Sequence, residues 1–207
     1  MIVFRYTKTD GAEYISHLDM LRHLNKIIRR AGINANYSKG FNPHMSIFMS
    51  APIAVGVKSL SEYCLVDCEA EEHLFIQKFN EHTFNGVVCL NAFSVNKKVN
   101  VQGAINRAIY SLSGISPFDV NQVLNAEKFE ITDKKGNKKD VRHKHFNLFF
   151  EGDLLIAELG FGNDTLRPDY LTNELVSRYG GCNVGIVKTN MLVDEVTFDD
   201  YVKQFKN

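Results

Sequence analysis

The sequence predicts an α+β fold of two tandem ferredoxin-like halves, in which antiparallel sheets are backed by helices. In the first half, periodic apolar patterns follow the order strand, helix, strand, strand, helix, strand, which is the ferredoxin-like order. The second half repeats this order loosely. A composition of 44% hydrophobic residues, with 15 Phe and 8 Tyr among 207 residues, is sufficient for a packed core without covalent cross-links.

The first half is most clearly marked at its first helix. Ser16 is the expected N-cap, and Asp19 stands three residues later, as in a weaker form of the capping box. Apolar residues then recur at helical spacing over residues 17–31, and Gly32 is the expected stop. The other expected elements are a strand, an extended stretch, a loop, a strand, a helix and a strand, over residues 2–6, 33–37, 38–52, 62–68, 71–82 and 87–95.

The second half is predicted from weaker signals. Ser116 before a proline predicts a helix start, and the turn at residues 151–153 predicts a hairpin. The expected strands cover residues 107–113, 129–132, 139–142, 146–150, 154–161, 182–188 and 191–198, and the expected helices cover 117–126 and 168–179. We place the junction at residues 96–106, which gives halves of residues 1–98 and 104–207. The duplication rests on element order alone, because the two halves share no recognisable sequence identity.

Charge and cysteine content indicate a cytoplasmic protein without a membrane anchor. Lys and Arg total 24, as do Asp and Glu, so any anionic partner must meet a local patch. The first residues lack the pattern of a secretory signal, and no apolar run approaches the ~20 residues of a membrane helix. The four cysteines fit neither a disulfide framework nor a C-x-x-C metal site, and we expect buried or inert thiols. They are Cys64, Cys68, Cys89 and Cys182.

The most informative stretch is a loop of residues 37–44, here called the 37–44 loop. Phe41 and Tyr37 would stack on a nucleobase, and Lys39 and His44 would meet phosphate. In the alternative interpretation, the aromatic residues fill the core. The candidate ligand-binding residues of the loop are Tyr37, Ser38, Lys39, Gly40, Phe41, Asn42, Pro43 and His44.

The start of the first helix is a second candidate site, formed by Ser16, His17 and Asp19. Free N–H groups and the positive end of the dipole attract anions to a helix N-terminus. The same dipole disfavours a protonated His17, which suits a neutral donor or base. The alternative is an ordinary capped helix that carries a partly exposed histidine.

A third candidate is the basic segment, residues 134–145, which holds six Lys and Arg residues and one acid, Asp140. Such a segment can grip a polyanion through Arg142 and its lysines, although exposed turns are often basic for no functional reason. Downstream, Arg167 would either clamp a phosphate or pair with Asp140. His143 and His145 share one strand face but lack further ligands, so we predict no metal and no cofactor.

Several motifs of common enzymes are absent from the sequence. It contains no P-loop, no G-x-G-x-x-G after a strand and no G-x-S-x-G elbow. We therefore expect no complete catalytic centre in this chain.

The same candidate residues resemble a known family. The matching runs are Tyr14 to Asp19, Arg29 to Gly32, Tyr37 to His44, Pro52 to Gly56, Ser59, Glu62-Tyr63, Val141-Arg142 and Leu166 to Asp169. They resemble the bacterial family called radical-SAM-associated (or radical-SAM-linked) protein, a domain of unknown function. Its members occur alone or fused to the C-terminal side of a radical S-adenosylmethionine protein. Residues 45–48 depart from the Pro-x-Ile-Ser-Phe-like run that the resemblance leads us to expect.

The resemblance implies a radical S-adenosylmethionine protein as partner and a genomic setting near ribosomal-protein and RNA-processing genes. This chain lacks the C-x-x-x-C-x-x-C ligand set of a radical enzyme, so another chain would perform any radical chemistry.

Three hypotheses follow. The first is an accessory module that binds RNA, either tRNA or rRNA, and presents it to the radical enzyme. The second is a metal-independent endoribonuclease, in which His17 is the base and Lys39 or Arg142 stabilises the phosphorane. The third is a module that binds a protein or a small molecule and no RNA.

Overall fold

The first half folds around a sheet whose two faces are both buried. The computed structural model describes residues 1–144 and 146–206. The elements of the first half are β1 (Ile2–Lys8), η1 (Ala12–Tyr14), α1 (His17–Arg30), β2 (Ile47–Met49), β3 (Lys58–Val66), α2 (Glu72–His82) and β4 (Cys89–Ser94). Strands pair in the order β4-β1-β3-β2, all antiparallel. The predicted order of strands and helices is confirmed here, although β2 lies in a stretch predicted as loop. The expected extended stretch at residues 33–37 forms only isolated bridges, Ala35 with Cys68 and Tyr37 with Met45.

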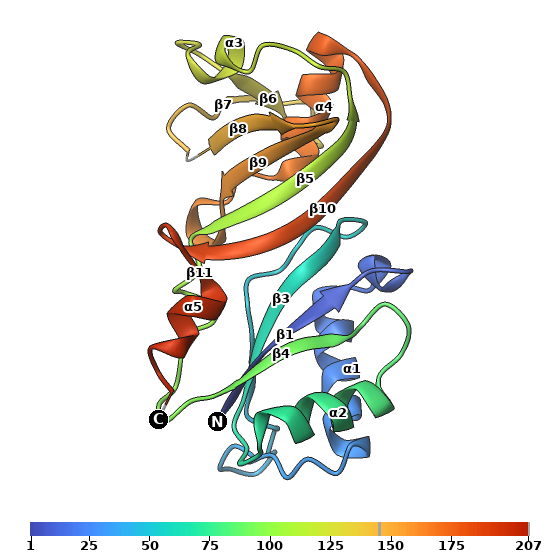
Figure 1. Cartoon of the computed structure of the whole chain (residues 1–207), viewed down its shortest axis with the longest axis vertical. Coiled ribbons are helices and arrows are strands. Elements are labelled where there is room, and N and C mark those ends of the chain that lie inside the picture. The colour runs from blue at the N-terminus through green and yellow to red at the C-terminus, as the bar shows by residue number, and fades with distance from the viewer. Residues whose placement is uncertain (145, 207) are drawn as a thin grey trace.

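One face of this sheet packs against α1 and α2 (Figure 1). Phe4 of β1 lies 5.1 Å from Phe75 and 5.3 Å from Phe79 of α2, measured between ring centroids. Val3 points to the opposite face, as alternation in a strand requires. That second face belongs to the core of the other half, where Tyr63 meets Phe198 at 4.6 Å.

The second half has one long curved sheet and a small separate one. Its elements are β5 (Arg107–Ile115), α3 (Asn121–Leu124), β6 (Glu130–Thr132), β7 (Lys138–Asp140), β8 (Phe146–Glu151), β9 (Leu154–Gly160), η2 (Gly162–Asp164), α4 (Pro168–Tyr179), β10 (Gly181–Val193), β11 (Val196–Thr197) and α5 (Phe198–Lys203). The main strands pair antiparallel in the order β10-β5-β9-β8, and β6 pairs only with β7. Figure 1 shows the second half above the first, with α4 beside β5 and β10.

The two halves share one mixed sheet of nine strands. β2 covers only one end of the outer edge of β3, and the free end pairs in parallel with β10 through Lys58–Val187 and Ser59–Lys188. The antiparallel strands predicted for each half are therefore joined into one sheet, which is mixed because β3 and β10 run parallel. An exposed strand edge is a ready template for pairing, and β10 occupies this one.

Two predicted elements in the second half differ from the structure. Only Asn121–Leu124 is helical in the segment predicted as a helix over 117–126, because Ser116 N–H donates to the Gly180 carbonyl and Phe118 stacks on Tyr179 at 4.1 Å. The strand predicted over 191–198 is instead the end of β10 followed by β11 and α5. Thr197 caps α5 by accepting a hydrogen bond from the Asp200 N–H, a capping signal that the sequence analysis overlooked.

The last helix fastens the second half onto the first. Asp199 of α5 accepts hydrogen bonds from the Tyr63 hydroxyl at 2.7 Å, from Asn91 at 3.0 Å and from Arg5 at 3.3 Å. Arg5 also donates to the carbonyl of Thr189 in β10. One carboxylate thus connects α5 to β1, β3 and β4.

The cysteines follow the prediction at three positions. Cys64, Cys68 and Cys89 are buried, and burial raises the pKa of Cys68 to about 11 and that of Cys89 to about 12. Cys182 is exposed, so only its inertness remains a prediction. Among the described residues, none of the helices has the length and apolar character needed to span a bilayer.

Candidate nucleic-acid interface

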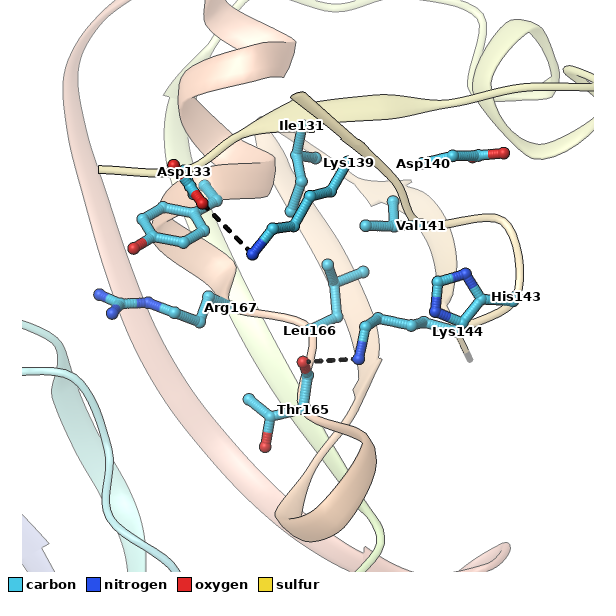
Figure 2. A pocket seen from close by; sticks show the side chains of 11 residues that line it. Ile131, Asp133, Lys139, Asp140, Val141, His143, Lys144, Thr165, Leu166 and Arg167 are labelled. Carbon is cyan, nitrogen blue, oxygen red and sulfur yellow. Dashed lines mark hydrogen bonds and ion pairs between the residues drawn. The ribbon is translucent and has the colours of Figure 1, made fainter. Parts of the chain in front are cut away.

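A pocket of about 540 Å³ lies between the basic segment and the start of α4 (Figure 2). Its lining combines apolar side chains with cations and with the carboxylates of Asp133 and Asp140. Apolar walls with a few charged groups are the usual composition of a small-molecule site. The apolar residues are Ile131, Val141, Leu166 and the ring of Tyr170, and the cationic side chains belong to Lys139, Lys144 and Arg167.

Each rim cation is positioned by a local acceptor. Lys139 pairs with Asp133 at 3.2 Å, and Lys144 pairs with Asp164 at 2.9 Å and donates to the Thr165 carbonyl. Arg167 makes two hydrogen bonds to Asp169, at 2.9 and 2.5 Å, and its guanidinium lies 4.4 Å from the Tyr170 ring centre.

The predicted alternative of an Arg167–Asp140 pair is wrong. The Asp140 carboxylate instead accepts the backbone N–H groups of Phe129 and Arg142, and these hydrogen bonds lower its pKa. Asp140 thereby shapes the turn that follows β7. The partner of Arg167 is Asp169, two residues along the chain.

Most of the cationic charge of the basic segment is not consumed by internal pairing. Within the described part of the chain, Lys134, Lys135 and Lys138 form no ion pair and are exposed. Arg142 lies over the Phe146 ring, 5.2 Å from its centre. His145, which the sequence analysis paired with His143, lies outside the described residues. Among residues 1–144 and 146–206, no group of three His, Cys, Asp or Glu side chains is arranged to hold a metal ion.

The 37–44 loop is fully on the surface. The interpretation that its aromatic residues fill the core is wrong, since the Phe41 side chain has no cover and Tyr37 is exposed. The loop is nevertheless ordered by its own backbone. Ser38 and His44 exchange hydrogen bonds at 2.8 and 3.0 Å, and the Tyr37 hydroxyl accepts from Arg29 near the end of α1.

The start of α1 lies at the junction of the halves. Ser16 accepts the Asp19 N–H and donates to its carboxylate at 2.7 Å, so the predicted cap is confirmed and both residues are engaged in it. His17 lines a small hollow together with Lys8 and Glu62. Behind it, Glu62 Oε1 lies 2.7 Å from the ammonium of the fully buried Lys188.

Burial, reinforced by nearby Lys8, lowers the pKa of His17, and the attraction of Glu62 offsets only part of this. Unfolded His17 has its ordinary pKa of about 6.5, so the unfolded chain binds the proton first as pH falls. The stability of the fold should therefore decrease below about pH 6.5. Chemical denaturation of the wild type and of His17→Gln between pH 5 and 8 measures this. A wild-type decline no steeper than that of the variant would contradict it, because the other histidines are common to both.

The structure brings some candidate residues together and separates others. Arg167 and the basic segment meet at the pocket. His17 and Lys39 do not meet, because the Arg29–Tyr37 hydrogen bond holds the 37–44 loop at the far end of α1, a helix of 14 residues and hence about 21 Å long. An endoribonuclease site that joins these two side chains is not formed.

Three residues of the junction and pocket were overlooked in the sequence, Lys8, Lys188 and Tyr170, and Glu62 was noted only as part of the family resemblance. A usable signal existed for two of them, because Glu62 and Lys188 interrupt otherwise apolar or small-residue strands. A charge in such a run is rarely buried unless it has a partner.

A family described as "Uncharacterized protein conserved in bacteria (DUF2344)" matches residues 1–168, which include both halves as far as the start of α4. No curated protein matches the sequence.

Proposed function

Because the chain belongs to the DUF2344 family of uncharacterized bacterial proteins, its activity has to be inferred from its own residues, and we propose that it is an accessory RNA-binding module. In this proposal it presents a tRNA or rRNA, in the cytoplasm, to a radical S-adenosylmethionine protein. The chemistry belongs to the partner.

The observation that carries the proposal is the pocket beside the basic segment. A volume of about 540 Å³ is sufficient for one unpaired nucleotide. The apolar walls and the Tyr170 ring suit a base, and Lys139, Lys144 and Arg167 suit its phosphates (Figure 2). The exposed lysines of the basic segment extend this cationic surface along a strand of RNA.

The 37–44 loop supplies a second, distant contact. Figure 1 places the loop at the lower end of the molecule and β6 and β7 at the upper end. A mononucleotide cannot reach both places, whereas a folded RNA or a partner protein can. An uncovered Phe41 beside Lys39 suits stacking on a base.

The partner is proposed from the sequence resemblance to the radical-SAM-associated family. That resemblance includes Arg167 at the pocket and the whole 37–44 loop. Under this proposal the pocket and the 37–44 loop have one role. An RNA bound at one of these surfaces stays accessible to a partner enzyme bound at the other.

We also propose that the halves, residues 1–98 and 104–207, are two ferredoxin-like units. The order β4-β1-β3-β2 in the first half has the same form as β10-β5-β9-β8 in the second. In the second half the first helix would be reduced to α3, with the β6–β7 pair inserted after it.

Removing two exposed lysines of the basic segment should weaken RNA binding strongly. For Lys135→Ala/Lys138→Ala we expect about 20-fold lower affinity near 0.1 M salt, and a salt dependence shallower by about 1.4 in log–log slope. The reason is that each lost phosphate contact releases about 0.7 fewer counterions from a single strand. Filter binding of total tRNA and rRNA fragments at several salt concentrations measures both quantities.

The matched control is Lys26→Ala/Lys78→Ala, which removes the same charge from exposed positions on α1 and α2. This control should bind like the wild type. Equal losses in both double variants would show that only net charge matters, and absence of binding by the wild type at low salt would refute the RNA proposal.

A further inference from the structure

A nearly buried cation at the junction of the halves lacks a partner. Lys8 is only 3% exposed, yet its ammonium makes no hydrogen bond or ion pair with any described residue. It lines the hollow that it shares with His17 and Glu62. Burying an unpaired charge is costly, so such a residue is expected to have a ligand.

Nearby carboxylates do not compensate Lys8. Glu62 is engaged with Lys188, and the buried Glu13 accepts the Gly11 N–H at 2.7 Å. Burial lowers the pKa of Lys8 more than Glu62 and Glu13 raise it. The pKa of Lys188 is lowered for the same reason. A further negative charge nearby would stabilise the protonated forms of both Lys8 and Lys188.

The hollow has a suitable shape for one end of a larger ligand. Its free volume of about 10 Å³ admits roughly one oxygen atom. Through Ile53 it adjoins a second hollow of about 250 Å³, which Tyr110 and Phe161 also line. Thr165 and Arg167 in turn line both this second hollow and the nucleotide-sized pocket. From the basic segment to Lys8, each of the three spaces thus shares at least one lining residue with the next.

We propose that the hollow at the junction binds a phosphate group, with the Lys8 ammonium as counter-ion and the His17 ring as hydrogen-bond donor. One phosphate oxygen enters beside Lys8, and the remainder of the group lies in the second hollow. The identity of the ligand as RNA rests on the proposed function, whereas the phosphate site rests on Lys8 and the hollow alone. A strand whose nucleotide occupies the pocket would continue along these spaces and deliver a neighbouring phosphate to Lys8.

The test is thermal unfolding of the whole chain with inorganic phosphate, against chloride at equal ionic strength. Wild-type Tm should rise by about 2–5 °C at a tenfold excess over the dissociation constant. Lys8→Met should lose most of the phosphate-dependent rise and keep only the part that phosphate supplies elsewhere on the protein. Its Tm without phosphate should equal or exceed that of the wild type, because the variant removes an unpaired buried charge. Lys39→Met, at the exposed 37–44 loop, should keep the full rise.

His17→Gln is the second variant and should show a reduced rise, which keeps the test valid if Lys8→Met fails to fold. The site is refuted if phosphate does not stabilise the wild type, or if both junction variants retain the whole effect. Lys135→Ala/Lys138→Ala separates the two proposals. This variant should lose RNA affinity and keep the phosphate-dependent rise in Tm. The RNA proposal and the phosphate site can therefore be refuted independently.

Discussion

Glu62→Ala is expected to lower the free energy of unfolding by about 3–5 kcal/mol, the usual cost of leaving one member of a buried ion pair alone. Lys188 has no exposed surface, and its ammonium lies 2.7 Å from Glu62. No other described carboxylate forms an ion pair with it, so the variant leaves a buried cation in the joint between β3 and β10. Urea denaturation followed by circular dichroism measures the change.

The matched control is the double replacement Glu62→Leu/Lys188→Met, which removes both charges and retains side-chain volume. It should recover most of the lost stability, because an apolar pair of similar size often replaces a buried ion pair without penalty. A double variant as unstable as Glu62→Ala would show that packing, and not charge, dominates at this position.

Asp199→Ala should cost about 2–4 kcal/mol, because this carboxylate accepts charge-assisted hydrogen bonds from three strands of the first half. Tyr63 would lose the acceptor of its hydroxyl and Arg5 one of its acceptors, and α5 would lose these polar contacts with the first half. Thermal and urea unfolding both report the loss, and limited proteolysis should cleave first near α5.

The adjacent Asp200 provides a close control. Its carboxylate pairs with Lys203 on the surface, where both side chains are half exposed. Exposed ion pairs of this kind contribute little to the free energy of unfolding, so Asp200→Ala should leave that free energy nearly unchanged. If the two neighbouring variants unfolded alike, the network around Asp199 would have no special role.

The sequence predicts the first half well because each signal there is local. Ser16 caps α1, apolar spacing continues to the end of that helix, and the order of strands follows from alternation. The predictions that fail are those for segments whose structure depends on contacts with residues far away in the sequence. The stacking of Phe118 on Tyr179 replaces most of a predicted helix, and the pairing of β10 with β3 merges two predicted sheets.

The candidate site also contains features that the sequence could predict and features that it could not. Arg167, the basic segment and the surface position of the 37–44 loop could be proposed from residue chemistry. The grouping of Lys8, His17 and Glu62 could not, because these side chains come from β1, α1 and β3, which lie together only in the folded first half. The Arg167–Asp169 pair is local, and the sequence was misread there. Periodicity reveals which face a side chain occupies and not which element lies opposite.

The central position of β10 also determines the order in which the chain can fold as it leaves the ribosome. Residues 1–94 contain every strand and helix of the first half, so that half can assemble while the remainder is still being made. β10 is translated after all strands of the large sheet except β11, yet it lies between β3 and β5. Until residues 181–193 emerge, the open edges of β3 and β5 can pair with another nascent chain. Slow translation of this final stretch should therefore increase aggregation more than a pause at the 96–106 junction.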